Sequence, residues 1–157
     1  MILFMLNLVL MVAWAILLGN FGWLTLLSGF VVGYLALLAS RPLYGPSRYF
    51  GAVWRVLGLA GYFLYDLMRS SVAVVWDVLT PSHHARPGII AVPLTAEKDG
   101  EIMLTANLIS LTPGTLSLDI SPDRKTLWVH GMFVDDPDAL RKSLKDGMER
   151  RVMETVR

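Results

Sequence analysis

MILFMLNLVLMVAWAILLGNFGWLTLLSGFVVGYLALLAS, residues 1–40, contains no Lys, Arg, Asp or Glu. All 14 Lys and Arg residues and all 13 Asp and Glu residues of the 157-residue chain lie at or after Arg41. The chain therefore divides into a charge-free apolar part and a part of nearly ordinary globular composition. This division excludes a wholly soluble protein, a disordered protein and a carrier that is embedded in a membrane along its whole length.

Residues 1–40 predict a membrane-spanning helical hairpin. A hydrocarbon core of roughly 30 Å requires about 20 apolar residues in a helix, and residues 1–18 and 23–39 are short of this length but sufficient. The turn is expected at GNFG, residues 19–22, where glycine and asparagine favour tight backbone geometry. A cleaved signal peptide is the alternative, but it would need a basic start and a single, shorter apolar core.

The flanking charges predict the orientation of this hairpin. Arg41, Arg48 and Arg55 follow the second segment with no acidic residue between them. The positive-inside rule places such a segment in the cytoplasm. Two spans then put both the N-terminus and the C-terminal part of the chain on the cytoplasmic side.

Three residues of the hairpin are candidates for helix packing. Asn7 lies within a span, where an amide requires a partner, and a hydrogen bond between helices is favoured over a role in transport. Gly29 and Gly33 form a Gly-xxx-Gly face that would let another helix approach closely.

A long amphipathic helix is expected next. Residues 41–51, RPLYGPSRYFG, contain two prolines and two glycines and predict a loop. Residues 52–79 then have a helical pattern, which Thr80-Pro81 ends. At 100° per residue its four charged side chains fall within an arc of about 80°: Arg55, Asp66, Arg69 and Asp77.

Two placements of this helix fit its pattern. The helix can lie in the inner membrane interface with its charges toward water, which we favour, or it can be a third span whose charges face another protein. Asp66 and Arg69 are spaced i, i+3 and can pair with each other. We therefore favour a structural role for Asp66 over a proton relay, although an acidic group within a membrane is a functional candidate by default.

The remaining residues predict a small α+β domain of order β-α-β-β-α. Residues 89–95 predict a strand, placed at a sheet edge by Pro93. Residues 99–111 predict a helix with Asp99 as its N-cap, which Pro113-Gly114 ends. Residues 115–121 and 126–133 predict two strands of a hairpin.

The last predicted helix starts at a clear signal. Asp136 can cap it, and Pro137 suits its first position. Three strands and two helices make a thin core, so this domain is expected to lean on the preceding helix or on a partner.

The sequence contains no signal for catalysis, a cofactor or a metal. It has no cysteine, P-loop, G-x-G-x-x-G or G-x-S-x-G motif. His83-His84 have no carboxylate or cysteine nearby and predict no metal site. The net charge of +1 argues against nucleic-acid binding.

Several strings together resemble the E subunit of the Mrp-type multisubunit Na⁺/H⁺ antiporters, the MrpE/MnhE/PhaE family. They are SRPLYGP (40–46), DLMRSSVAVVWDVLTP (66–81), RPGIIAVPL (86–94), NLISLTPGTLSLDIS (107–121) and LWVHGMFVDD (127–136). The resemblance covers essentially the whole chain, and LTPGT (111–115) and RPGI (86–89) are its most specific parts.

The resemblance implies a bacterial inner-membrane protein within a large hetero-oligomer. Its partners would be large multi-span subunits related to respiratory complex I, small membrane subunits and the lipid bilayer, with no nucleic acid and no small-molecule substrate. It implies an accessory subunit, needed for assembly or full activity, and carries over no catalytic residue. Two alternatives stay open: a stand-alone membrane-anchored binding or regulatory module, and proton conduction by this chain through Asp66 and Arg69.

The expected architecture has three parts. Residues 1–40 form the transmembrane hairpin, residues 41–81 the loop and amphipathic helix, and residues 82–157 the small cytoplasmic α+β domain. The candidate structural or partner-contact residues are Asn7, Gly29, Gly33, Arg41, Arg55, Asp66, Arg69, Asp77, Pro113 and Gly114.

Overall fold

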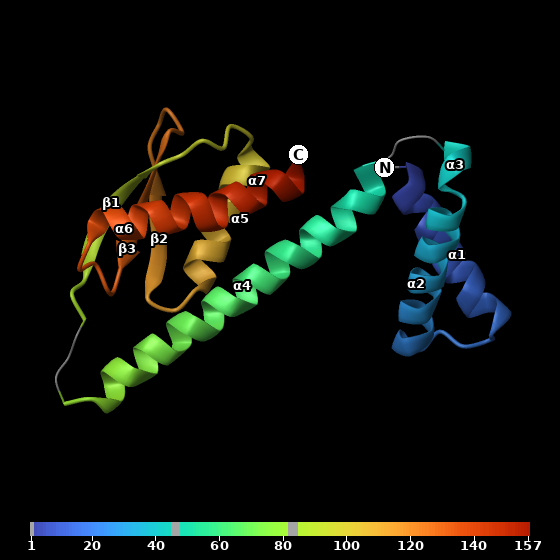
Figure 1. Cartoon of the computed structure of the whole chain (residues 1–157), viewed down its shortest axis with the longest axis horizontal. Coiled ribbons are helices and arrows are strands. Elements are labelled where there is room, and N and C mark those ends of the chain that lie inside the picture. The colour runs from blue at the N-terminus through green and yellow to red at the C-terminus, as the bar shows by residue number, and fades with distance from the viewer. Residues whose placement is uncertain (1, 45–47, 82–84) are drawn as a thin grey trace. The chain divides into compact units, whose positions relative to one another are not determined.

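The computed structural model describes residues 2–44, 48–81 and 85–157 (Figure 1). The chain combines helices with one small antiparallel sheet. It divides into two compact units, Met1–Trp54 and Arg55–Arg157, and helix α4 (Arg48–Leu79) contributes to both. His83-His84, for which no metal site was predicted, lie outside the described residues.

The first unit contains the charge-free sequence. Helices α1 (Ile2–Leu17) and α2 (Trp23–Ala39) are joined by the turn at residues 18–22. Gly19 has a φ of 61°, which glycine adopts without strain, and Asn20 Oδ1 accepts a hydrogen bond of 2.7 Å from the Gly22 amide. The predicted Gly-Asn turn is confirmed.

Among the described residues, no helix combines the length and the apolar composition that crossing a membrane requires. The membrane-spanning hairpin therefore stays a prediction.

The predicted loop at residues 41–51 is wrong. Helix α3 (Arg41–Tyr44) lies within it, and α4 begins at Arg48, before the predicted start at Ala52. The physical reason is that a proline interrupts only a helix that has already begun. In a first turn the missing N–H has no intrahelical partner to lose, so Pro42 is compatible with α3.

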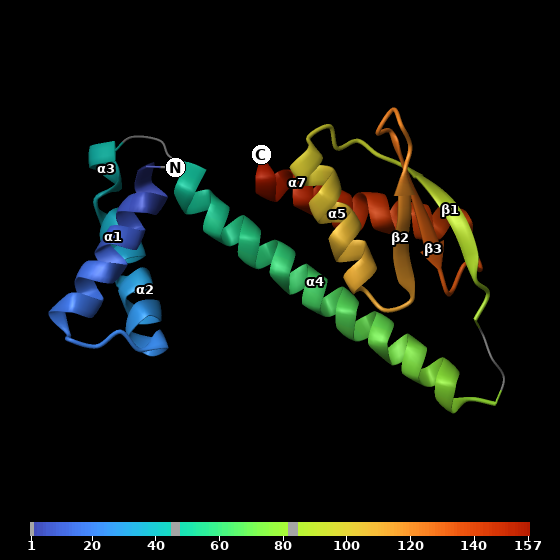
Figure 2. The ribbon, with the colours of Figure 1, turned by 180° about the vertical axis from the view of Figure 1, so that it is seen from behind.

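The second unit is built on a three-stranded antiparallel sheet (Figure 2). Its strands are β1 (Gly88–Pro93), β2 (Thr115–Ile120) and β3 (Thr126–Gly131), in the order β1-β3-β2. Pro93 lies on the edge strand β1, as predicted.

Two helical segments pack against this sheet. Helix α5 (Asp99–Leu111) has the predicted bounds, but its N-cap is Lys98 rather than Asp99, whose carboxylate pairs with Arg124 instead. The last helix is divided into α6 (Pro137–Lys142), a π-helical segment η1 (Ser143–Glu149) and α7 (Arg150–Val156).

The predicted start of this last helix is confirmed. The Asp136 carboxylate accepts hydrogen bonds from the amides of Asp138 and Ala139, and Pro137 follows it at the first helical position.

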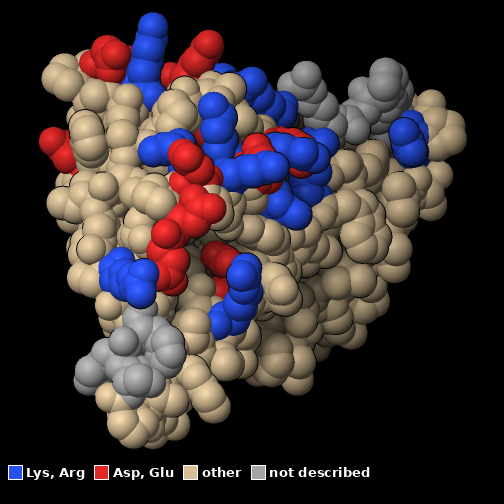
Figure 3. Space-filling model, turned by 60° about the vertical axis from the view of Figure 1, so that its left-hand side comes forward, with Lys and Arg blue, Asp and Glu red and all other residues tan. Residues whose placement is uncertain are grey.

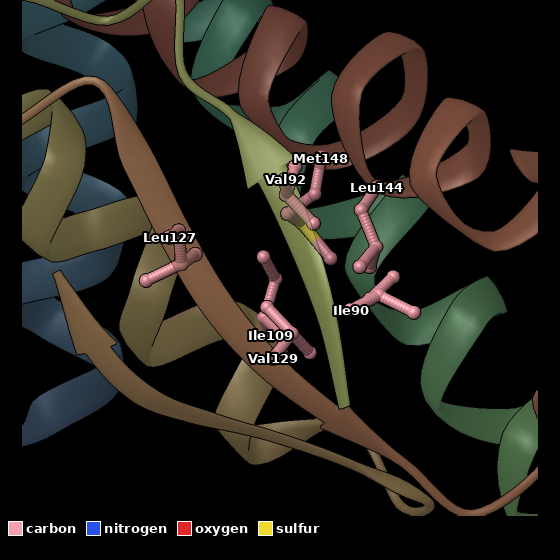
Figure 4. Close-up of a cluster of buried hydrophobic side chains, with 7 residues drawn as sticks. All are labelled: Ile90, Val92, Ile109, Leu127, Val129, Leu144 and Met148. Atoms are coloured by element: carbon pink, nitrogen blue, oxygen red, sulfur yellow. The ribbon is translucent and has the colours of Figure 1, made fainter. Parts of the chain in front are cut away.

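The core of the second unit lies between the sheet and these helices (Figure 4). It consists of Ile90, Val92, Ile109, Leu127, Val129, Leu144 and Met148. Leu59, Tyr62 and Phe63 of α4 pack against it and are themselves partly buried. The thin domain leans on the preceding helix, as expected from its size.

Candidate partner-contact site

The four charges that share one side of α4 define a polar stripe: Arg55, Asp66, Arg69 and Asp77. In the second unit this stripe is turned toward the sheet-bearing domain of the same chain. Asp66 and Arg69 line one cavity, Arg55 lines another, and Asp77 is 3% exposed. A broad apolar face of the same helix is left uncovered.

The larger cavity, here called the Asp66 cavity, has a volume of about 450 Å³. Asp66 and Arg69 of α4 form one wall, and the loop Thr112–Thr115 after α5 forms another. Pro113 and Gly114 are part of that loop, so four of the candidate residues meet here. The rest of the lining comes from α4, from the end of β3 and the segment after it, and from the last helix: Ser70, Ala73, Gly131, Phe133, Asp135, Asp136, Ala139, Leu140, Ser143 and Leu144.

The backbone of the Thr112–Thr115 loop is held by its own hydrogen bonds. Gly114 has a φ of 86°, a conformation that L side chains rarely adopt. Thr115 Oγ1 donates to the Ile109 carbonyl at 2.7 Å, and the Gly114 carbonyl accepts from the Met132 amide at 2.7 Å. The loop is thereby fixed to both α5 and the end of β3.

The carboxylates opposite Asp66 already have partners in the domain. Asp135 pairs with Arg86 at 3.4 Å, and Asp136 caps α6. Three carboxylates and one guanidinium therefore line the Asp66 cavity, and Arg86, which is outside the lining, compensates the charge of Asp135. Among the described residues, no three His, Asp or Glu side chains are grouped so that they could hold a metal ion.

Asp77 fixes the far end of α4 to the start of the domain. Its Oδ1 accepts a hydrogen bond of 3.1 Å from the Ala85 amide. Buried carboxylates require such partners, because an uncompensated charge in the interior is costly.

Arg55 occupies the other end of the stripe. It lines a cavity of about 370 Å³ between α4 and α7, here called the Arg55 cavity. Its Nε atom is buried and has no hydrogen-bond partner among the described residues.

The candidate residues of the first unit mostly serve the contact between α1 and α2. A Cβ added to Gly33 would collide with Asn7 Oδ1, and one added to Gly29 would lie 3.0 Å from the Met11 carbonyl oxygen. The Gly-xxx-Gly face thus contacts α1 of the same chain. Arg41 lies in α3 and is exposed.

Asn7 joins α1 to the beginning of α4. It is fully buried, and its amide nitrogen donates to the Tyr49 hydroxyl at 2.6 Å. The ring of Tyr49 lies 5.8 Å from that of Tyr34 and 5.5 Å from that of Phe50, between centroids.

Two buried carboxylates were missed by the sequence interpretation. Glu101 is fully buried and accepts two hydrogen bonds from the Arg157 guanidinium, which lower the pKa of this carboxyl group. Glu149, 1% exposed, accepts from the Thr95 amide at 2.5 Å and from the Ala96 amide at 2.8 Å. Neither pairing has a local sequence signal, since each joins residues more than 50 positions apart.

A broad face of α4, which begins beside Arg69 and reaches the side opposite Arg55, is apolar and exposed. Seven of its side chains fall within an arc of about 120° at 100° per residue, here called the apolar arc. They are Leu57, Leu64, Met68, Val72, Val75, Trp76 and Leu79. Figure 3 shows charged side chains clustered together, blue beside red, with wide uncharged areas around them. Exposed apolar side chains that repeat along one face of a helix, as those of the apolar arc do, mark contact with a protein or a membrane.

Comparison with known proteins gives consistent similarities. Residues 7–155 match the family model MNHE, described as a Na⁺/H⁺ ion antiporter subunit. The Na⁺/H⁺ antiporter E subunit of Alkalihalophilus pseudofirmus is 34% identical over 153 residues, which cover 98% of this chain and 97% of that protein. The E subunit of the Bacillus subtilis Na⁺/H⁺ antiporter is 33% identical over 131 residues, 83% of each chain.

Two solved structures are also similar. A chain in the structure of the Mrp complex from Dietzia sp. is 31% identical with a TM-score of 0.51, covering 66% of this chain and 96% of that one. A chain of the membrane-bound sulfane sulfur reductase, an archaeal respiratory membrane complex, shares the fold with a TM-score of 0.58, 23% identity and 96% coverage of both chains.

Proposed function

This chain belongs to the MNHE family of Na⁺/H⁺ ion antiporter subunits, and from this membership in a multisubunit membrane complex we propose that it is an accessory, structural component. In this role it is needed for assembly or full activity, and the ion path lies in other subunits. It has no enzymatic activity of its own.

The observation that carries this proposal is the division of α4 into two faces. The polar stripe is turned toward the chain's own domain, where Asp77 accepts a hydrogen bond from Ala85 and Asp66 lines a cavity together with Pro113. The apolar arc is exposed and is the surface of α4 that other molecules can contact. Such a helix binds and positions partners, whereas an ion path requires polar groups facing the route of the ion.

We further propose how the chain is arranged at the bacterial inner membrane. The charge-free residues 1–40 are embedded as a hairpin, and α4 lies in the cytoplasmic interface with its apolar arc toward lipid and neighbouring subunits. Arg41 lies directly after the hairpin, and the positive-inside rule then places the N-terminus and the α+β domain in the cytoplasm.

Deletion of this chain tests the proposed role. A host lacking its own antiporters would carry the remaining subunits with or without this chain, and Na⁺-dependent proton exchange would be measured in membrane vesicles. We expect exchange to be lost or strongly reduced without the chain and restored when it is supplied from a second plasmid. Undiminished exchange would show that the chain is not needed.

The Asp66→Asn variant separates this role from proton conduction by the chain itself. The substitution keeps the size of the side chain but removes its titratable group. We expect exchange to continue in assembled complexes, because the ion path lies elsewhere. Loss of exchange with normal assembly would favour the conduction alternative.

Purification distinguishes the accessory role from a stand-alone regulatory module. After extraction in a mild detergent, the tagged chain is expected to copurify with several larger multi-span proteins. A chain that purifies alone and stays monodisperse would favour the stand-alone module.

A further inference from the structure

The Arg55 cavity, of about 370 Å³, brings together two helices that are far apart in the sequence. Its wall on α4 carries Arg55, Gly58, Leu59 and Tyr62, and its wall on α7 carries Arg151, Glu154 and Thr155. The proposed accessory role makes no use of this cavity.

Arg55 lines this cavity and has an unused hydrogen-bond donor. Its Nε atom is buried and has no hydrogen-bond partner among the described residues. Thr155 Oγ1 of α7 lies 3.4 Å from the Arg55 carbonyl oxygen, so the two helices are close at this point. A buried donor without a partner is unfavourable, so a bound acceptor would stabilise this arrangement.

Arg151 supplies a second guanidinium that is already held in position. Its Cζ atom lies 3.9 Å from the centroid of the Tyr62 ring, and one terminal nitrogen donates to the Gly147 carbonyl at 3.1 Å. Stacking and one hydrogen bond leave other N–H groups of this side chain available.

The single carboxylate of the wall does not cancel these two charges. Glu154 Oε1 is 2.9 Å from Nε of Arg150, an arginine outside the lining, so its charge is already compensated. A Cβ added to Gly58 would meet nothing within 4 Å, so the wall is open at this point. The cavity therefore combines two guanidinium groups with free space, an arrangement that suits a phosphate group.

We propose that the Arg55 cavity binds the phosphate group of an anionic phospholipid. Guanidinium groups bind phosphate oxygens through paired, charge-assisted hydrogen bonds. Val56 follows Arg55 on the same helix and is 52% exposed, which gives an acyl chain an apolar surface beside the headgroup. The phosphate site rests on Arg55 and Arg151, whereas the choice of a lipid as its source rests on the proposed placement of α4 at the membrane surface.

Binding to the full chain tests this site. The chain, purified in an uncharged detergent, would be titrated with short-chain phosphatidylglycerol, short-chain phosphatidylcholine and inorganic phosphate, with the heat of binding measured. We expect phosphatidylglycerol to bind saturably. Phosphatidylcholine, which lacks net charge, and inorganic phosphate, which lacks acyl chains, should each bind at least roughly tenfold more weakly. Preference for inorganic phosphate would overturn the lipid source, and no binding of either anion would overturn the site.

Variants then locate the binding. Arg55→Gln and Arg151→Gln are each expected to weaken phosphatidylglycerol binding by roughly tenfold or more, because each removes charge-assisted hydrogen bonds. Lys142→Gln is the matched control: it removes one positive charge from an exposed position of the same terminal helix, outside the cavity. It is expected to change binding by less than about twofold.

Arg55→Lys keeps the charge but removes Nε, and it is expected to bind more weakly than the wild type and more tightly than Arg55→Gln. If Arg55→Gln lowers the thermal stability of the chain, the binding of Arg55→Lys shows instead whether the Arg55 guanidinium holds the phosphate. Equal weakening by Lys142→Gln and Arg55→Gln would overturn the site in favour of general charge attraction. If the phosphate site is absent, Na⁺/H⁺ exchange by the complex would still depend on this chain. If the accessory role is wrong, exchange would be undiminished when the chain is deleted, whatever the lipid titrations show.

Discussion

Glu101 and Arg157, 56 positions apart in the chain, are joined by two parallel hydrogen bonds of 3.0 and 3.1 Å. The Glu101 side chain is completely buried, whereas half of the Arg157 side chain is exposed. This pair fastens the end of the last helix to the first turn of α5. Lys98 adds a third charge, 3.7 Å from the Glu101 carboxylate.

The pair makes the stability of the domain depend on pH. Hydrogen bonding to Arg157 lowers the pKa of Glu101. A lowered folded-state pKa stabilises the fold above the unfolded value of about 4.3, and this contribution is lost as pH falls through the folded-state pKa. For Glu101→Gln we expect a lower melting temperature than the wild type at about pH 7 and a difference that shrinks toward about pH 3.

Thermal unfolding of the full chain in detergent, followed by circular dichroism, checks this prediction. Asp146→Asn is the control, since Asp146 is a carboxylate on η1 that is not part of the pair. Its melting temperature should follow that of the wild type at every pH. A deficit for Glu101→Gln that stays constant across the pH range would contradict the assigned role.

Glu149 provides the acceptor for two amides where β1 has ended. Glu149→Ala would leave the Thr95 and Ala96 amides without this acceptor, and Ala96 is 4% exposed. We expect a loss of about 2–4 kcal/mol in the free energy of unfolding. Glu149→Gln keeps an oxygen at the Oε1 position and should lose less than half as much. Equal losses in denaturant titrations of the two variants would show that the accepted hydrogen bonds are not the cause.

Close packing of α1 against α2 predicts the effect of enlarging Gly29. A side chain there meets the backbone of α1 at Met11, which cannot rotate away. Gly29→Leu is expected to destabilise the first unit by about 1–3 kcal/mol through overpacking. Gly61→Ala is the control, because an added Cβ there meets nothing within 4 Å and raises helix propensity. A Gly29→Leu chain that melts no lower than Gly61→Ala would refute the close contact.

The hydrogen bond between Asn7 and Tyr49 predicts coupling between their substitutions. A double-mutant cycle with Asn7→Ala and Tyr49→Phe should give an interaction energy of about 1 kcal/mol, as measured from thermal stability in detergent. Pairing Asn7→Ala with Tyr65→Phe is the control, because Tyr65 is 65% exposed and lies in the second unit. Additive effects for the first pair would show that the 2.6 Å contact contributes nothing.

Elements with local signals were predicted well from the sequence. The bounds of α5 were predicted because Pro113-Gly114 ends it, and the start of α6 was predicted because Asp136 and Pro137 act within one turn. The polar stripe was likewise predicted, since its residues recur at the helical period. What lies near the stripe could not be predicted, because Asp66 lines a cavity together with a loop more than 40 residues later.

The buried face of α5 shows why the rest was missed. Its buried residues include Glu101 and Thr105 beside Ile102 and Ile109. Apolar periodicity predicts that a glutamate faces solvent. The distant Arg157 supplies two hydrogen bonds to its carboxylate, so no inspection of residues 99–111 would place it inside.

The π-helical segment Ser143–Glu149 decides which side chains of α7 face the domain. A π-turn contains one residue more than an α-turn, so the helix after it is out of phase with the helix before it. Rewinding the same residues as an α-helix would rotate everything beyond them by about 100°. Arg151 would then lose its position over the Tyr62 ring, and Val152 would leave the interior. Deleting one residue between 143 and 149 would instead allow an α-helix that keeps both residues in place, so this segment is where the length of the chain can change by one residue without rotating α7.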